Sequence, residues 1–491
     1  MAENLKDKTA KGLFWGAMNS GLMQVLNTLF GIVLMSLLSP EDYGMIGVLA
    51  IYSAIAQNLQ ESGFISALIN RKNATRLDFS SVFWFNIVVG ICIYAILWLC
   101  APLIAQYNND DRLIWLSRYA FLGFFCASFS IVPRAKLMKE LKVKELTYIT
   151  VTALIISDVM AVVMALCGMA YWGMATQSII NVTVISILSW VYAKWHPRFE
   201  FSLQPIKEMF GFSCKILITN IFENVNKYAF ESILGGKLGG GYSKTEIGYY
   251  NSANKWNLMG SQTITGMIQS VAQPMFVQAG DDNERLCRIF RKMLRFTAFV
   301  SFPLMFGLIL VCPQFIEGIF RDKWLQSIPL LQILSVGGAF LPITTLYSKF
   351  IISRGKSGIY MWNTIIMSLL VIAELFCVQH FGWTLFGLSG IRLMVVLYVA
   401  ITVLWFFVWH FFVWREIRLN LFSAIIDILP FLLLSAGTMV ATYFLTKMIS
   451  SIWILFVVRI IIAAIIYLGI LWLLKAEMLK ECVNYLRKKH G

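Results

Sequence analysis

The sequence predicts an all-α polytopic membrane protein with about 14 transmembrane helices, arranged as two parallel six-helix bundles followed by two additional helices. First, 58% of the 491 residues are hydrophobic and only 14% are charged, whereas soluble proteins carry about 25% charged residues. Second, the apolar runs have the length of membrane-crossing helices rather than of the short alternating strands of a membrane barrel. Third, the first half of the chain is weakly repeated in the second half.

The expected spans are runs of about 20–28 apolar residues bounded by charges or turn residues. In chain order they are 12–38, 43–68, 79–106, 113–135, 145–168, 170–194, 208–234, 247–278, 294–313, 326–352, 357–380, 383–411, 421–446 and 449–474. The basic segment MAENLKDKTAKG leads into the first span without a small-residue cleavage site, so we expect no cleavable signal.

The loops on the two sides of these spans differ in charge. Most of the 41 Lys and Arg residues fall in the tails and in loops on their side, whereas the other side holds only Arg112, Lys237, Lys244, Arg321, Lys323 and Lys447. The positive-inside rule therefore places both termini in the cytoplasm. Because the net charge of +15 is spread over many short loops, it forms no single basic patch, and we expect no nucleic-acid partner.

An internal repeat supports the two-bundle organisation. KGLFWGAMNSGLMQVLN from Lys11 aligns with KEMFGFSCKILITNIFE from Lys207, and further on Tyr43-Gly44 aligns with Ile247-Gly248. An even number of spans separates the copies, so they share one orientation, and transporters place substrate sites between such repeats. We predict a first bundle at 1–206, a second at 207–412, and two further helices with a basic cytoplasmic tail at 413–491.

The most unusual stretch is Lys215–Glu231, which lies inside an expected span. On a helix its polar residues occupy about half of the circumference. They are Lys215, Asn220, Glu223, Asn224, Asn226, Lys227 and Glu231. Ionisable groups at membrane depth are costly and usually functional, so we expect this face to line a cavity. Pairing within the helix, from Glu223 through Lys227 to Glu231, is the alternative for part of the cluster.

The following span carries a second polar stripe. Asn251, Lys255, Gln262, Gln269 and Gln273 fall within about 40° of one another on a helical wheel. Such amides also join membrane helices, at about 0.6–2 kcal/mol per contact, but a whole stripe beside a charged helix favours the wall of a hydrated cavity. Cations suited to phosphate, with amides suited to sugar hydroxyls, predict a ligand such as a lipid-linked glycan.

Other intramembrane charges have separate interpretations. Arg118 either faces the cavity or extends to the membrane interface, whereas Glu61 and Asp158 each need a cation, a proton or water. Glu374, Arg392, Asp427 and Arg459 complete the set. For Asp427 and Arg459, on the last two spans, we expect a structural ion pair.

The sequence contains no enzyme or metal signature. The nine cysteines lie mostly in apolar runs without a CxxC pair and the four histidines are scattered, so we expect packing cysteines, no metal site and no cofactor. A glycine-rich phosphate loop and a G-x-S-x-G motif are both absent. The outward loops Gly235–Glu246 and Gln314–Gln326 are too short for a catalytic domain. We therefore expect a protein that is not an enzyme.

Several motifs resemble those of a known family. LSPEDYGMIGVLAIYSAI (Leu38–Ile55) and ESGFISALI (Glu61–Ile69) resemble the first hairpin of Wzx-type oligosaccharide-lipid flippases, in the colanic-acid exporter-like branch of the multidrug/oligosaccharidyl-lipid/polysaccharide (MOP) superfamily. IGYYNSANKW (Ile247–Trp256) and SVAQPMF (Ser270–Phe276) extend the resemblance into the second half. It covers essentially the whole chain and identifies the family rather than the substrate.

The resemblance implies the MOP flippase fold and a bacterial inner-membrane location. It implies that alternating access moves an undecaprenyl-pyrophosphate-linked repeat unit to the periplasmic leaflet, for lipopolysaccharide, capsule or exopolysaccharide synthesis. Implied partners are this lipid-linked oligosaccharide, membrane lipid, and the polymerase and glycosyltransferases of the same pathway. The candidate cavity residues are Lys215, Asn220, Glu223, Lys227, Glu231, Asn251, Lys255, Gln262, Arg118 and Glu61. Because some relatives couple to Na⁺ or H⁺, Asp158 and Glu61 are the candidates for ion coupling.

Two other functions are alternatives to transport of a lipid-linked glycan. A multidrug or organic-cation antiporter on the same fold would favour an acidic cavity, whereas the clustered lysines favour anions. A membrane glycan polymerase, ligase or glycosyltransferase would need a substantial outward loop with catalytic residues, and this chain offers only short ones.

Overall fold

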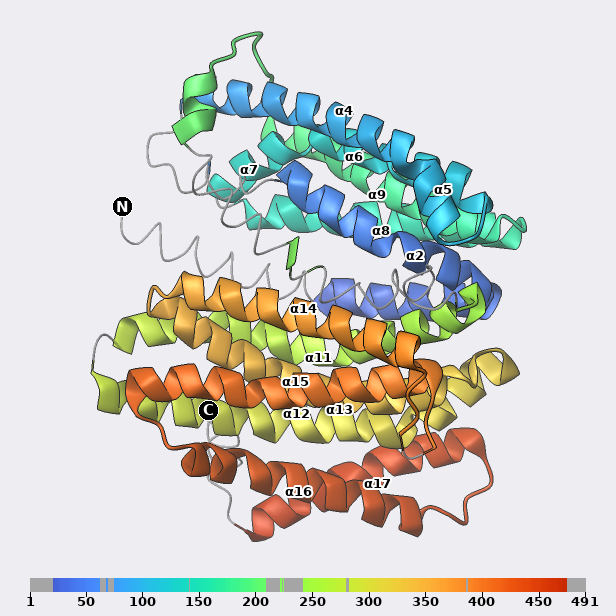
Figure 1. Ribbon diagram of the computed structural model, residues 1–491, viewed down its shortest axis with the longest axis vertical. Coiled ribbons are helices and arrows are strands. Elements are labelled where there is room, and N and C mark those ends of the chain that lie inside the picture. The colour runs from blue at the N-terminus through green and yellow to red at the C-terminus, as the bar shows by residue number, and fades with distance from the viewer. Residues whose placement is uncertain are drawn as a thin grey trace. The chain divides into compact units, whose positions relative to one another are not determined.

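The computed structural model describes residues 21–61, 68, 75–140, 142–208, 221–222, 224, 242–279, 282–385 and 387–474. The chain divides into two compact units, unit 1 (Met1–Gly248) and unit 2 (Tyr249–Gly491). Among the described residues every extended regular element is a helix, and the only β-structure is an isolated bridge between Leu385 and Leu388 (Figure 1). The prediction of an all-α protein is confirmed.

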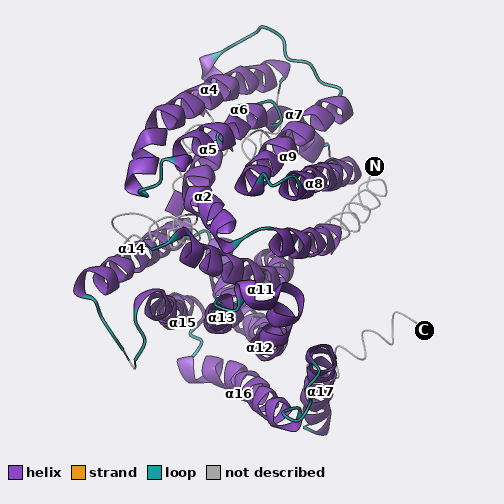
Figure 2. Cartoon of the chain, turned by 90° about the vertical axis from the view of Figure 1, so that its right-hand side faces the viewer, coloured by secondary structure: helices purple, strands orange, loops and turns teal. Residues whose placement is uncertain are grey.

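The described part of unit 1 starts with a short apolar helix, Gly21–Leu37. The helices that follow are α2 (Pro40–Glu61), α4 (Arg76–Tyr107), α5 (Arg112–Ala120), α6 (Leu122–Ser128), α7 (Ile131–Lys139), α8 (Val143–Leu166) and α9 (Ala170–Ala193). Helix α8 packs along α9, and α4 packs on α5 and α6 (Figure 2). The first residues of α11 (Lys244–Ala279) complete this unit.

Unit 2 contains the rest of α11 and a set of long helices. They are α12 (Asn283–Phe320), the short 3₁₀ helix η2 (Arg321–Trp324), α13 (Ser327–Ser353), α14 (Ser357–Phe381), α15 (Gly390–Ile417), α16 (Leu421–Leu445) and α17 (Ile452–Leu473). Helix α12 is central, because it packs against α13, α16 and α17. Helix α13 packs in turn against α15 (Figure 1).

The described residues contain 9 helices long and apolar enough to cross a membrane. A tenth span is formed if the bent pair Arg112–Ser128 and Ile131–Lys139, which meet at 44°, counts as one. The protein is therefore a multi-pass membrane protein with 9 to 10 candidate spans in its described part, and the larger predicted number is not confirmed.

Helices α2 and α11 begin in the same way. Ser39 precedes α2, and its backbone N–H donates to the Asp42 carboxylate at 2.8 Å while the Asp42 N–H donates to Ser39 Oγ at 3.3 Å. Ser243 precedes α11 and makes the same pair of hydrogen bonds with Glu246, at 3.0 and 3.2 Å. Both are capping boxes, which satisfy backbone donors that a helix start leaves open. The aligned repeat segments thus share local structure as well as sequence.

Each unit has its own aromatic core. In unit 1, Phe83 makes edge contacts with Phe129, Trp190 and Trp195, and the Trp190 indole N–H donates to the Phe129 carbonyl at 2.8 Å. In unit 2, Phe290 packs against Tyr347 and Phe350. Edge-to-face pairs of this kind add about 0.5–1.5 kcal/mol each beyond their buried area.

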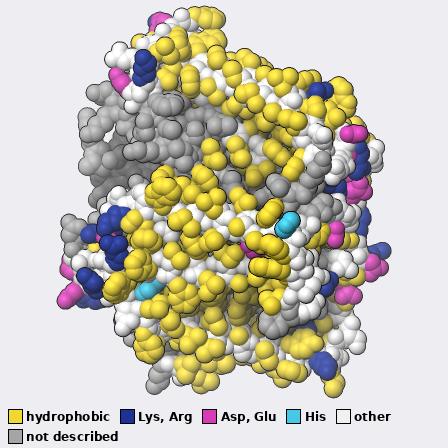
Figure 3. Space-filling model, in the orientation of Figure 1, with side chains coloured by type: hydrophobic (Ala, Val, Ile, Leu, Met, Phe, Trp, Pro, Cys, Tyr) yellow, Lys and Arg dark blue, Asp and Glu magenta, His cyan; other side chains and the backbone are white. Residues whose placement is uncertain are grey.

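The outer faces of the helices are apolar. Leu99 on α4 is 75% exposed and Trp472 on α17 is 72% exposed, although a soluble protein would not leave such contiguous faces open to water. Figure 3 shows hydrophobic side chains spread over the visible helix faces, with Lys and Arg gathered toward helix ends. This distribution fits helices that are surrounded by lipid.

The predicted ion pair between Asp427 and Arg459 is wrong. Asp427 is 4% exposed and accepts from Arg291 Nε at 2.7 Å and Nη2 at 3.0 Å, with Arg295 Nε 3.5 Å away. Arg459 donates to the Leu310 carbonyl at 3.0 Å and to Gln314 Oε1 at 2.6 Å. Asp427 therefore links α16 to α12, and Arg459 links α17 to α12.

Candidate functional site

The charged helix predicted at Lys215–Glu231 lies almost entirely outside the described residues. This applies to Lys215, Asn220, Glu223, Lys227 and Glu231. Glu61 is the last residue of α2, and only its backbone is described. Their proposed roles rest on the sequence.

The second polar stripe falls on α11, and the side chains of Gln269 and Gln273 lie outside the described residues. Asn251 and Lys255 are half-buried and Gln262 is exposed, and their spacing places them along one side of this 36-residue helix. The helix is more polar than α12 and α13, and unlike them it is not among the candidate membrane spans of the described residues. A long helix that combines a buried apolar side with this stripe can present amides and a cation to a polar ligand.

A further polar row on α11 was missed from the sequence. Asn257, Ser261 and Thr265 are buried and repeat every four residues. Ser261 Oγ donates to the Asn257 carbonyl at 3.0 Å, and Thr265 Oγ1 donates to the Ser261 carbonyl at 2.9 Å, so both hydroxyls are satisfied by their own helix. Asn257 faces α13, where a Cβ added to Gly338 would stand 2.3 Å from Asn257 Oδ1. This row serves helix packing.

Arg118 packs against aromatic side chains. Its guanidinium carbon lies 4.6 Å from the ring centroid of Trp98 and 5.1 Å from that of Trp115. Trp115 is 63% exposed, so this group lies at the surface of unit 1. Cation–π contacts beside exposed tryptophans are typical of the membrane interface. The surroundings therefore favour the interfacial interpretation of Arg118.

Asp158 lies in a polar layer between α8 and α9. It is buried and accepts a hydrogen bond from the Gln177 amide, and one helical position away Asn181 Nδ2 donates to Ser157 Oγ at 3.3 Å. Gly173 permits this close approach, because its added Cβ would lie 3.2 Å from the Ala161 carbonyl. Sequence reasoning identified Asp158 but missed Gln177 and Asn181, which read as isolated polar residues in apolar runs.

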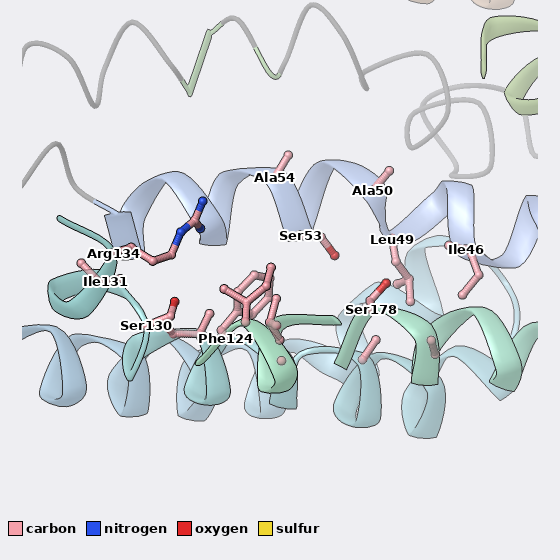
Figure 4. A pocket seen from close by; sticks show the side chains of 16 residues that line it. Ile46, Leu49, Ala50, Ser53, Ala54, Phe124, Ser130, Ile131, Arg134 and Ser178 are labelled. Atoms are coloured by element: carbon pink, nitrogen blue, oxygen red, sulfur yellow. The ribbon is translucent and has the colours of Figure 1, made fainter. Parts of the chain in front are cut away.

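Unit 1 also contains a cavity of about 350 Å³ between α2, α6, α7 and α9. Its walls are mainly apolar, with residues such as Ile46, Leu49 and Phe124. Figure 4 shows the Arg134 side chain extending from α7 along this cavity, near the hydroxyl of Ser130. No sequence pattern predicted it. Among the residues with described positions, no cluster of three or more His, Cys, Asp or Glu side chains could hold a metal ion.

Comparison with solved structures defines the fold of the chain. The chain is similar in structure to the lipid II flippase MurJ in an inward closed conformation, with a TM-score of 0.71 over 93% of this chain and 97% of MurJ, at 14% sequence identity. The chain therefore has the same fold as MurJ.

The family follows from the sequence comparison. The chain belongs to the polysaccharide biosynthesis protein family, whose profile matches residues 33–329, more than half of its length. It is 27% identical to the teichuronic acid biosynthesis protein TuaB of Bacillus subtilis (strain 168), over 79% of each chain. It is 25% identical to the lipopolysaccharide biosynthesis protein WzxC of Escherichia coli (strain K12), over 82% of this chain and 81% of WzxC. The chain is a Wzx-like transport protein of polysaccharide biosynthesis rather than an enzyme.

Proposed function

We propose that this protein flips undecaprenyl-pyrophosphate-linked oligosaccharide units from the cytoplasmic to the periplasmic leaflet of a bacterial inner membrane. The main support for this proposal is the long helix α11, which carries Asn251, Lys255 and Gln262 along one side in a chain of this family. The amides suit sugar hydroxyls and the lysine suits a phosphate. The relatives TuaB and WzxC are named for the biosynthesis of teichuronic acid and of lipopolysaccharide, which supports this class of substrate.

The proposed topology has 14 spans with both termini in the cytoplasm. The part of the chain that the structure describes has 9 to 10 candidate spans. The other expected spans are the shorter apolar helix Gly21–Leu37, the polar helices α2 and α11, and the stretch around Lys215. On this topology the Ser39 and Ser243 caps face the periplasm. Labelling of terminal tags from outside intact cells would contradict this topology.

The substrate cavity is proposed to lie between the two predicted bundles, 1–206 and 207–412. Its wall would combine the α11 stripe with the charged helix, so that Lys215, Lys227 and Lys255 meet the pyrophosphate. Asn220, Asn251, Gln262, Glu223, Glu231 and Glu61 would contact sugars or balance the lysines. Transport then proceeds by alternating access, because a charged glycan cannot cross apolar lipid unshielded.

Replacement of all three lysines by alanine tests this cavity. The Lys215→Ala, Lys227→Ala and Lys255→Ala protein should be made at the normal level but lose export of surface glycan by 10-fold or more, since each lost phosphate contact is charge-assisted and worth about 1.5–3 kcal/mol. Lys447→Ala, in an exposed loop, is the matched control. Normal glycan export by the triple variant would refute the lysine cavity.

Ion coupling is proposed for Asp158, supported by its buried position beside the Gln177 amide. Asp158→Asn should then remove any dependence of transport on a Na⁺ or H⁺ gradient, while Gln177 keeps a partner. A gradient dependence that survives in Asp158→Asn would exclude this residue. The polymerase and glycosyltransferases of the same pathway are the proposed protein partners.

A further inference from the structure

An apolar groove of about 450 Å³ lies on the surface of unit 1, between α9 and the join of α6 to α7. Cys126 of α6 and Phe129, which follows that helix, line one wall. The other wall belongs to the last turns of α9 and includes Ile187 and Val191, which are 58% and 61% exposed. Because α9 is a candidate membrane span, its exposed apolar residues face lipid rather than water.

The bend of 44° between α6 and α7 leaves two backbone carbonyls without their usual helical donors. In an α-helix each carbonyl accepts from the N–H four residues further on. Four residues after Cys126, the Ser130 N–H donates instead to the Ala127 carbonyl, at 2.9 Å. Four residues after Phe129 stands Pro133, which has no N–H. Open carbonyls are costly at membrane depth, so both need another donor.

Helix α9 supplies both donors. Ser186 Oγ donates to the Cys126 carbonyl at 2.8 Å, and the Trp190 indole N–H donates to the Phe129 carbonyl at 2.8 Å. Thr183, the other hydroxyl residue of the lining, donates to a carbonyl of its own helix at 2.7 Å. The hydroxyl and indole groups of the lining are thus satisfied within the protein, so the groove suits an apolar occupant.

Basic side chains lie at one end of the groove. Lys194 follows the last residue of α9, one turn beyond the groove, and is exposed. His196 is also exposed, and its ring centroid lies 6.2 Å from that of Trp190 in the lining. The carbonyls at a helix C-terminus would repel an anion, but Lys136 Nζ donates to the carbonyl of the last α9 residue at 2.9 Å. This end can therefore accept a negative charge beside the apolar groove.

We propose that the groove binds one acyl chain of an anionic phospholipid, whose headgroup phosphate contacts Lys194 and His196. The lysine ammonium and an imidazole N–H donate to phosphate oxygens. The surrounding bilayer is as apolar as the groove, so the headgroup decides which lipid is retained. On the proposed topology this end of α9 faces the cytoplasm, and the lipid comes from that leaflet. The site lies within unit 1 and does not depend on the glycan that is transported.

Photo-crosslinking tests the site. The full-length protein is reconstituted in phosphatidylcholine vesicles that contain a trace of phosphatidylglycerol or phosphatidylcholine with a diazirine in the acyl chain. Peptide mass spectrometry then locates the crosslinks. Phosphatidylglycerol should label the segments 126–129 and 183–191 about fivefold more than phosphatidylcholine does, the factor that one basic residue contributes at an anionic membrane surface. Equal labelling of these segments by the two lipids would overturn the proposal.

A variant of the basic end tests the headgroup contact. Lys194→Gln combined with His196→Phe removes both donors but keeps a ring against Trp190. In this variant, labelling by phosphatidylglycerol should fall to the level of phosphatidylcholine. Lys207→Gln, which changes another exposed lysine of unit 1, is the matched control and should keep the preference. If the preference persists without Lys194 and His196, these residues do not bind the headgroup.

A second variant tests the acyl-chain contact and leaves the basic end intact. Val191→Trp fills the groove and should at least halve the labelling of segments 126–129 and 183–191 by both lipids. The matched control is Val88→Trp on α4, where the valine is 57% exposed and lies outside the groove lining. That control should label like the unchanged protein. Full labelling in Val191→Trp would show that the chain does not lie in the groove.

Discussion

Arg459 shows how this fold accommodates a charge deep in an apolar helix. The side chain is 5% exposed, and its partners are the Leu310 carbonyl, Gln314 Oε1 and Thr446 Oγ1. A guanidinium has five donors, so neutral oxygens can satisfy it without a carboxylate. Asp427 in turn receives two hydrogen bonds from Arg291. The ion pair and the arginine site are therefore independent links from α12 to the last two helices.

A double-mutant cycle checks this independence. Asp427→Asn and Arg291→Gln should show a coupling energy of about 1–2 kcal/mol in thermal unfolding in detergent. This coupling energy is smaller than that of a fully buried ion pair, because Arg291 is partly exposed. Asp427→Asn and Arg459→Gln should be additive within about 0.5 kcal/mol. A larger coupling for the second pair would restore the ion pair expected from sequence.

The residue-scale error has a physical origin. Sequence position gave Asp427 and Arg459 compatible depths, but depth does not define the direction in which each helix turns its side chain. That direction depends on packing against α12, which lies more than a hundred residues earlier. Gln177 beside Asp158 was missed for the same reason, since only the contact of α8 with α9 brings them together.

At the scale of elements, α11 carries most of the candidate substrate-binding residues whose side chains the structure describes. Its middle presents Asn251 and Lys255, and its other side packs through Asn257 against Gly338. The polar stripe was predictable because helical periodicity is a local property. The contact of Asn257 with α13 was not, because it depends on which residue of the neighbouring helix lies opposite it.

At the scale of the whole molecule, the class and family were predictable from sequence. Hydropathy defines a multi-pass helical protein, and the motifs around Leu38–Ile55 identify the family that the profile over residues 33–329 establishes. The described residues give 9 to 10 candidate spans rather than 14, and α2 and α11 are not among them because they are more polar than the other long helices.

The most direct test of the central claim is leaflet exchange by the full-length protein in proteoliposomes. Vesicles would carry undecaprenyl-pyrophosphate-linked oligosaccharide, and an added lectin or glycosidase would report the fraction of glycan in the outer leaflet over time. The account predicts exchange that increases with protein, falls at least 10-fold in the Lys215, Lys227 and Lys255 triple alanine variant, and is retained in Lys447→Ala. Exchange no faster than in protein-free vesicles, together with uptake of cationic dyes by the same protein, would contradict it.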